Sequence, residues 1–170
     1  YSGYIVFQMP QNETEYWDLK IDYTIEGTAF TATSVIDVPA SAKRKVNSFM
    51  GTDNVRYIVA LVEPFEPKVA VNDMTALVFK MENMMSFPAV NDFTLKIDPR
   101  MPSMGNHGSP NNVDLTSSTT DEFYHGKLSL TMTGYWKINL QLANAADEIL
   151  KGEAITETNE ASSLFFEIEF

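Results

Sequence analysis

Short segments in which apolar and polar residues alternate recur along the whole chain, and this alternation restricts the fold more than any other feature. In residues 17–25 (WDLKIDYTI) every second residue is apolar, and residues 136–142 repeat the pattern. A period of two is typical of strands that bury one face. Such strands, separated by turn residues, predict an all-β protein with an immunoglobulin-like antiparallel β-sandwich.

The same criteria locate the expected strands and the segments between them. Strands are expected at residues 4–9, 17–25, 30–38, 57–62, 74–81, 93–97, 128–132, 136–142 and 164–170. Residues 40–47 are polar and basic, which favours a linker. Residues 98 to about 122 are rich in Pro, Gly, Asn, Ser and Thr and predict a long loop. The only helical candidate, residues 143–150, is interpreted as a loop.

An internal repeat bears on the domain organisation. Residues 3–9 end in Met and are followed by a turn and Tyr16-Trp17, and residues 126–132 end in Met before Tyr135-Trp136. A repeat of this kind favours two sandwiches in tandem. Residues 1–45 would be the C-terminal strands of a truncated first β-sandwich domain, and residues 46–170 a complete second one. The alternative is one larger sandwich with two similar hairpins.

Composition excludes several classes of function. The chain has 23 acidic against 12 basic residues and a net charge of −11, so its surface repels nucleic acid. It has no cysteine, which removes disulfides, thiolate metal sites and a cysteine nucleophile. No apolar run is long enough for a membrane-spanning helix. Neither a Gly-x-Ser-x-Gly motif nor a phosphate-binding glycine loop is present, so a conventional enzyme is not expected.

Soft metal donors recur in the long loop. Met101, Met104 and His107 stand at every third position of the segment from Asp98 to Pro110, where Pro and Gly bend the backbone. Thioether sulfur suits Cu(I), and imidazole suits either copper oxidation state. The loop lacks the oxygen cluster that calcium or magnesium requires, and the chain has too few His and Cys residues for structural zinc. This spacing predicts a copper site.

Each donor also has a simpler interpretation. Methionine is commonly a flexible core residue, and Met132 alternates in phase with Leu128 and Leu130, so it is either core or the top of the core beside the loop. His125 either turns toward His107 or is a solvated turn residue. A second methionine cluster at residues 81–85 is expected to pack partly under the loop and could supply an extra ligand.

These motifs together resemble the YtkA-like/FixH-like domain family. The resemblance is carried by Met101-Pro102-Ser103-Met104-Gly105, by Tyr124-His125-Gly126 and by residues 130–138 (LTMTGYWKI), and it covers roughly residues 57–142. The stretch from Asp98 to Pro110 is similar to the version found in envelope lipoproteins of Bacteroidetes-type bacteria. The resemblance implies an immunoglobulin-like sandwich outside the cytoplasm and a link to copper handling or to the assembly of copper oxidases.

The family's methionines carry over onto Met101, Met104 and Met132. His107 stands where many relatives have another methionine or a small residue. The first hypothesis is therefore an extracytoplasmic copper-binding accessory protein or chaperone, periplasmic or anchored to the outer membrane as a lipoprotein. It would bind Cu(I) through the Met/His loop, with Met132 or His125 closing the site, and serve a copper importer or oxidase.

A second hypothesis is a non-catalytic structural or interaction subunit of a cell-envelope complex that binds no metal. The Met/Pro loop would then be a contact surface, because methionine-rich surfaces adapt readily to partners. The two hypotheses differ in where the donors point. Donor atoms of Met101, Met104 and His107 that converge on one point favour metal, whereas sulfurs buried in separate apolar pockets favour the second hypothesis.

Overall fold

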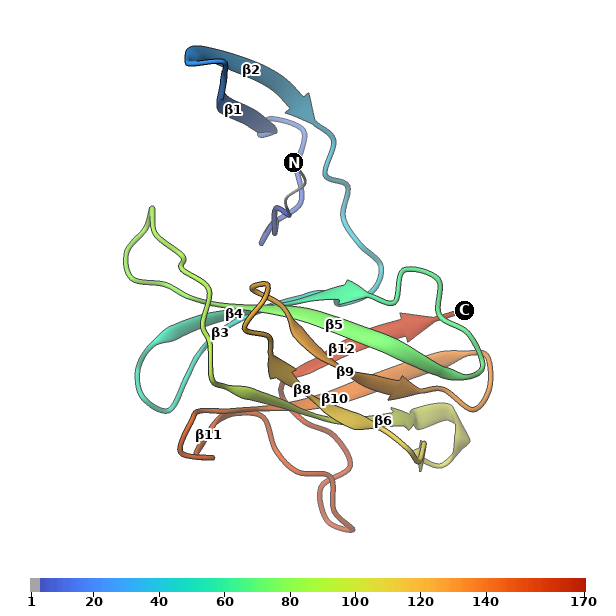
Figure 1. Cartoon of the computed structure of the whole chain (residues 1–170). Coiled ribbons are helices and arrows are strands. Elements are labelled where there is room, and N and C mark those ends of the chain that lie inside the picture. Colours follow the sequence, from blue (N-terminus) through green and yellow to red (C-terminus); the bar gives the residue numbers. More distant parts are fainter. Residues whose placement is uncertain (1–3) are drawn as a thin grey trace. The chain divides into compact units, whose positions relative to one another are not determined.

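The computed structural model describes residues 4–170, so Gly3, with which the sequence repeat begins, lies outside the described residues. The chain divides into two compact units, Tyr1–Ala42 and Lys43–Phe170. The division falls inside the polar stretch 40–47 that the sequence predicts as a linker, three residues before the expected boundary at 45. Figure 1 shows the strands of both units.

The first unit is built on one β-hairpin. β1 (Trp17–Ile25) pairs with β2 (Thr28–Ile36) in an unbroken antiparallel register. The connecting residues Glu26 and Gly27 have φ angles of 48° and 81°, which is the left-handed pair that a type I′ turn requires. The register places the alternating apolar residues of both strands on one face of the hairpin.

Residues 4–9, expected as a strand, do not form one. They fold onto the start of β1 instead. The Phe7 ring meets the Trp17 ring edge-on at a centroid distance of 5.2 Å, and the Trp17 indole donates to the Met9 carbonyl at 3.1 Å. The segment is therefore held by side-chain packing rather than by a strand edge.

The second unit is a single antiparallel sheet of short strands. They run in the order β11-β10-β6-β8-β9-β5-β4-β3. Their bounds are β3 (Val46–Met50), β4 (Arg56–Glu63), β5 (Val71–Lys80), β6 (Thr94–Met101), β7 (His107–Gly108), β8 (Val113–Ser117), β9 (Tyr124–Ser129), β10 (Tyr135–Ala143), β11 (Ile149–Lys151) and β12 (Phe165–Glu169). The described chain contains no α-helix, only the 3₁₀ turn η1 (Pro102–Met104). The all-β antiparallel prediction is thus confirmed, and residues 143–150 are not helical.

The sheet curls into a nearly closed barrel, in which two strands share one edge of β10. β12 pairs with residues 135–139 of β10, and β11 pairs with Leu142 and Ala143 farther along the same edge. The segment before β3 then bonds to β12, since the Glu167 amide donates to the Arg44 carbonyl at 2.9 Å. At the other end the Thr52 amide donates to the Leu150 carbonyl at 3.0 Å.

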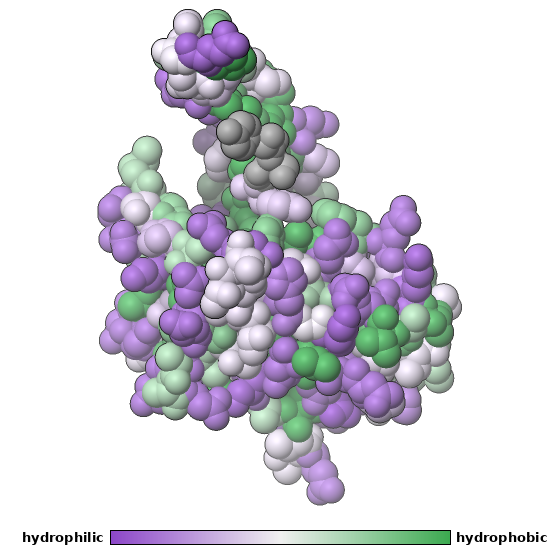
Figure 2. All heavy atoms as spheres, in the orientation of Figure 1, coloured by the Kyte–Doolittle hydropathy of each residue, from purple (hydrophilic) through white to green (hydrophobic). Residues whose placement is uncertain are grey.

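The interior of the barrel holds the core. The alternation in residues 136–142 correctly predicts its inward face, because the even-numbered side chains there are fully buried. They pack with large side chains from the other strands, including Met74, Leu95, Leu115, Tyr124, Leu128 and Phe166. Burial of this kind is the main favourable term in folding. Hydrophilic residues predominate on the face of the second unit that Figure 2 shows.

Four strands, β3, β7, β8 and β11, were not predicted from the sequence pattern, and β7 and β11 are only two and three residues long. β8 lies inside the predicted long loop 98–122, and β3 starts within the predicted linker 40–47. β8 contributes only Leu115 to the core, so it shows too little apolar alternation to be recognised. β6 is also longer than expected, because its pairing with β10 continues through Pro99 and Arg100. No helix among residues 4–170 has the length and apolar character to cross a membrane.

Candidate metal-binding loop

The Met/His loop is a tight reversal at the end of β6. β6 ends at Met101, η1 carries Met104, and β7 folds back so that His107 is the cross-strand partner of Met101. Gly105 and Asn106 make the reversal with φ angles of 64° and 58°. Gly and Asn are the residues that enter this left-handed region most readily. The structure thus brings three of the predicted donors into one short turn.

Polar contacts hold this turn in place. The Arg100 guanidinium pairs with the Asp98 carboxylate at 2.5 and 2.9 Å and donates to the Asn106 carbonyl at 3.4 Å. The Asn106 side chain donates to the Glu160 carbonyl at 2.9 Å. The bond to Asp98 also raises the pKa of Arg100. The spacing of soft donors does not point to these residues, although Asp98 and Arg100, two apart on a strand, share one face.

Burial separates the donors into two groups. Met101 is only 3% exposed and belongs to the core, and a Cβ added at Gly134 would lie 3.1 Å from its methyl carbon. Met132 is half-buried and packs against the same core. Met104 is 56% exposed and His107 is also exposed. Met104 and His107 therefore face solvent, while Met101 and Met132 make apolar contacts below the turn.

His125 lies elsewhere on the barrel. It is in β9, opposite Thr75 of β5 and Thr116 of β8. Thr116 in turn pairs with Thr94, at the opposite end of β6 from Met101. Met101 follows Thr94 by seven positions along β6, which corresponds to roughly 23 Å at about 3.3 Å per residue. The structure does not bring His125 to the loop.

The His125 ring contacts a carboxylate close to it in the sequence instead of the Met/His loop. Its Nε2 lies 3.2 Å from both oxygens of Asp121, four residues earlier. Hydrogen bonds, first from the Phe123 amide and also from His125, lower the pKa of Asp121. His125 is thus an exposed strand residue with a local partner, and it is not the turn residue that the simpler interpretation describes.

The second methionine cluster also lies away from the loop. The Met81 amide donates to the Arg56 carbonyl at 2.8 Å, beyond the Lys80 end of β5. Met132 follows the end of β9 that pairs with Val71, at the opposite end of β5. Residues 81–85 therefore do not pack under the Met/His loop.

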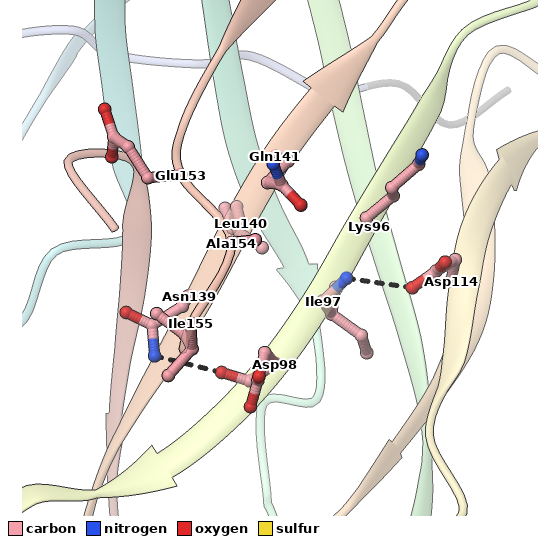
Figure 3. A pocket seen from close by; sticks show the side chains of 10 residues that line it. All are labelled: Lys96, Ile97, Asp98, Asp114, Asn139, Leu140, Gln141, Glu153, Ala154 and Ile155. Atoms are coloured by element: carbon pink, nitrogen blue, oxygen red, sulfur yellow. Dashed lines mark hydrogen bonds between the residues drawn. The ribbon is translucent and has the colours of Figure 1, made fainter. Parts of the chain in front are cut away.

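A polar depression of about 210 Å³ lies between β6, β10 and residues 153–155 (Figure 3). Its carboxylates are all engaged. Asp114 accepts the Ile97 amide at 2.9 Å, Asp98 pairs with Arg100, and Glu153 accepts the Ser163 amide at 2.5 Å. The last bond lowers the pKa of Glu153. Each carboxylate thus has a structural partner, which does not favour acid–base chemistry.

Across residues 4–170, no three His, Asp or Glu side chains are grouped so that they could hold a metal ion. The nine methionines of the chain are a separate source of soft metal donors.

Comparisons of the chain with protein-family models, with curated proteins and with solved structures found no match in any of the three.

Proposed function

We propose that the chain is a non-catalytic binding protein of the cell envelope that carries Cu(I) on its Met/His loop. Extracytoplasmic location, as a periplasmic protein or a lipoprotein, follows from the resemblance to the YtkA-like/FixH-like family. The finer description of the fold is also part of the proposal: the curled sheet is an immunoglobulin-like sandwich, as the resemblance implies, and residues 1–45 belong to a preceding one, as the internal sequence repeat favours. A copper importer or oxidase is the proposed recipient of the metal.

One observation carries the proposal. Met104 and His107 are exposed on either side of a two-residue left-handed turn that hydrogen bonds from Arg100 and Asn106 hold in place. A thioether and an imidazole so placed offer Cu(I) two donors of the type it prefers, on a fixed backbone.

Met101 and Met132 have a supporting role in this proposal. Their side chains pack in or against the core, so either sulfur would have to leave apolar surroundings to reach the metal. We therefore assign Met104 and His107 as the accessible ligands and Met101 and Met132 as the base that positions the turn. His125, whose neighbours across the sheet lie at the opposite end of β6 from Met101, is not part of this site.

The test is an anaerobic competition between the intact chain and a colorimetric Cu(I) chelator. The Met104→Ala/His107→Ala variant is expected to lose one bound equivalent of Cu(I). His125→Ala and Met9→Ala, which change an exposed histidine and an exposed methionine elsewhere, are the matched controls and are expected to retain it. Equal binding by the double variant and the intact chain would exclude the loop as the site.

The second candidate function is a metal-free interaction subunit of an envelope complex. It is favoured by the β1–β2 hairpin, whose apolar face is exposed at Ile21, Tyr23, Ile25 and Phe30. Tyr23 and Phe30 stack across the strands at 5.5 Å, which stiffens this face. Exposed apolar faces of this kind commonly mark interaction sites.

This candidate predicts a loss of complex formation rather than of metal binding. Ile21→Lys/Phe30→Lys changes the apolar face, and Lys20→Ala/Thr31→Ala changes the opposite face as a control. In cells, only the first variant should leave the high-molecular-weight fraction on size-exclusion chromatography of detergent extracts. If both variants stay in that fraction, or the native chain is never in it, the hairpin face is not an interaction site.

A further inference from the structure

The turn between β5 and β6 displays two neighbouring methionines. Met84 and Met85 are 78% and 93% exposed, and they form the two central residues of a turn closed by a bridge between Asn83 and Ser86. Full burial of a methionine side chain contributes about 1.5–3 kcal/mol. Met84 and Met85 are not buried, so neither makes this contribution. They occupy adjacent turn positions at which polar residues are usual.

The backbone of this turn is firmly held. The Ser86 amide donates to the Asn83 carbonyl at 3.2 Å, and the Met85 amide donates to the Asn83 side chain at 2.9 Å. The Glu82 amide donates back to the Ser86 carbonyl at 3.0 Å. Asn is favoured at the first position of a type I turn for this reason. Met84 and Met85 are therefore fixed at the tip by the hydrogen bonds of their neighbours.

A third methionine lies at the base of the turn. The Met81 amide bonds to the Arg56 carbonyl at 2.8 Å, and Met81 is half-buried. Three thioethers thus fall within five residues, two of them in one rigid turn. The carboxylate of Glu82 pairs with Lys80 at 3.7 Å and accepts the Ser86 hydroxyl at 3.3 Å, so it is engaged at the base.

We infer that this turn is a second soft-metal site, in which Met81, Met84 and Met85 bind Cu(I) or Ag(I) through three thioether sulfurs. Thioethers select soft monovalent ions, and flexible methionine side chains can converge on an ion from a fixed backbone. The donors differ from those of the Met/His loop, and the site does not depend on the loop binding metal.

The test is an Ag(I) titration of the chain with ¹³C-methyl-labelled methionine, followed by NMR. Ag(I) is a soft ion that undergoes no redox change here. In a Met104→Leu/His107→Asn background, the methyl signals of Met81, Met84 and Met85 are expected to shift together and to reach a plateau at one added equivalent. Met9, a single methionine that is 65% exposed, is the internal control and should not shift.

Signals that shift one at a time, or a Met9 signal that shifts as readily as Met84, would overturn the site. The Met84→Leu/Met85→Leu variant should lose this equivalent while remaining folded, because substitutions at such exposed positions usually change stability by less than about 0.5 kcal/mol. Failure of the Met/His loop proposal would be seen separately, as an unchanged Met104 signal in the native chain.

The pH dependence provides an independent readout. Thioether sulfur binds no proton in this range, so Ag(I) affinity at the turn is expected to be constant between about pH 5 and about pH 8. Affinity that falls at the lower pH would assign the ion to carboxylate or imidazole donors and would contradict a thioether site.

Discussion

Gly152 lies so close to the Leu140 carbonyl that a Cβ at position 152 would stand 2.1 Å from the Leu140 oxygen. Its φ of 92° is a second reason why only glycine fits there. Residues 152–164 leave the sheet between β11 and β12, and this contact fixes the point of departure.

Gly152→Ala should therefore reduce the free energy of unfolding by about 3 kcal/mol or more, because both the clash and the backbone strain must be relieved. Gly105→Ala is the matched control, since Gly105 also has a positive φ but has nothing within 4 Å of its Cβ position. It should cost only about 1–2 kcal/mol. Urea unfolding curves measure both, and similar losses for the two variants would contradict the assigned clash.

Met101 should behave as a core residue. Met101→Ala is expected to cost about 2–5 kcal/mol, because it removes a buried side chain and leaves a cavity. Met101→Leu conserves volume and should cost less than about 1.5 kcal/mol. Thermal unfolding measures stability, and the Cu(I) competition measures binding. If Met101→Leu stays folded but loses the bound ion, Met101 is itself a ligand and not only a support.

Buried Asn139 should be sensitive to removal of its amide. It donates to the Asp98 carbonyl at 3.0 Å and accepts the Ser162 amide at 2.9 Å, so it links β10 to β6 and to the segment before β12. Asn139→Ala removes the side-chain acceptor of the Ser162 amide, at a cost of about 1–3 kcal/mol, and the side-chain donor to the Asp98 carbonyl. Hydrogen exchange at the Ser162 amide should accelerate in this variant, and unchanged exchange would show that the segment is held by other contacts.

The hydrogen bond between Tyr135 and Glu167 should make the stability of the fold depend on pH in the acidic range. The Tyr135 hydroxyl donates to Glu167 at 2.6 Å, and this bond lowers the pKa of Glu167. A lowered folded-state pKa gives stability that is present above the unfolded-state value of about 4.3 and is lost as the pH falls through the folded value. In Tyr135→Phe the pKa of Glu167 rises, so the loss of stability between about pH 5 and pH 3 should be smaller.

Chemical denaturation across that pH range measures the effect. Ser163→Ala is a comparable control, because it removes a hydroxyl that donates to another carboxylate, Glu153, at 2.9 Å. Because that bond also lowers the pKa of Glu153, the Ser163→Ala curve should flatten through Glu153, and the two changes should add in the Tyr135→Phe/Ser163→Ala double variant. A Tyr135→Phe curve parallel to that of the native chain would show that the bond makes no pH-dependent contribution.

The local sequence pattern predicts a strand well where one face of the strand is buried. It predicts a strand poorly where the strand forms only because of pairing with segments distant in sequence. Residues 136–142 alternate cleanly, and their even-numbered side chains fill the core. β8 has a single buried apolar side chain, Leu115, and a register shift against β9, so its pairing depends on neighbours that are distant in sequence. Residues 4–9 are apolar without alternation, and they pack on Trp17 instead of pairing.

The candidate site follows the same division. Spacing alone was enough to place Met101, Met104 and His107 in one turn, because that proximity is local. The distance of His125 from the loop depends on the order β6-β8-β9 in the sheet, which no local pattern contains. The burial of Met101 and the exposure of Met85 likewise depend on which strand ends meet. The presence of a methionine in the sequence therefore could not show whether its side chain is in the core or is an exposed donor.

The seam of the barrel joins residues that are 123 positions apart, since the Arg44 amide bonds to the Glu167 carboxylate across it. Bringing such distant segments together carries a large loop-closure entropy, and folds dominated by such contacts fold slowly. On a translating ribosome, the edge of β3 would remain open until β12 emerged. We therefore expect closure of the barrel to be a late step in the folding of this chain, with the free strand edges open to pairing with other chains until it occurs.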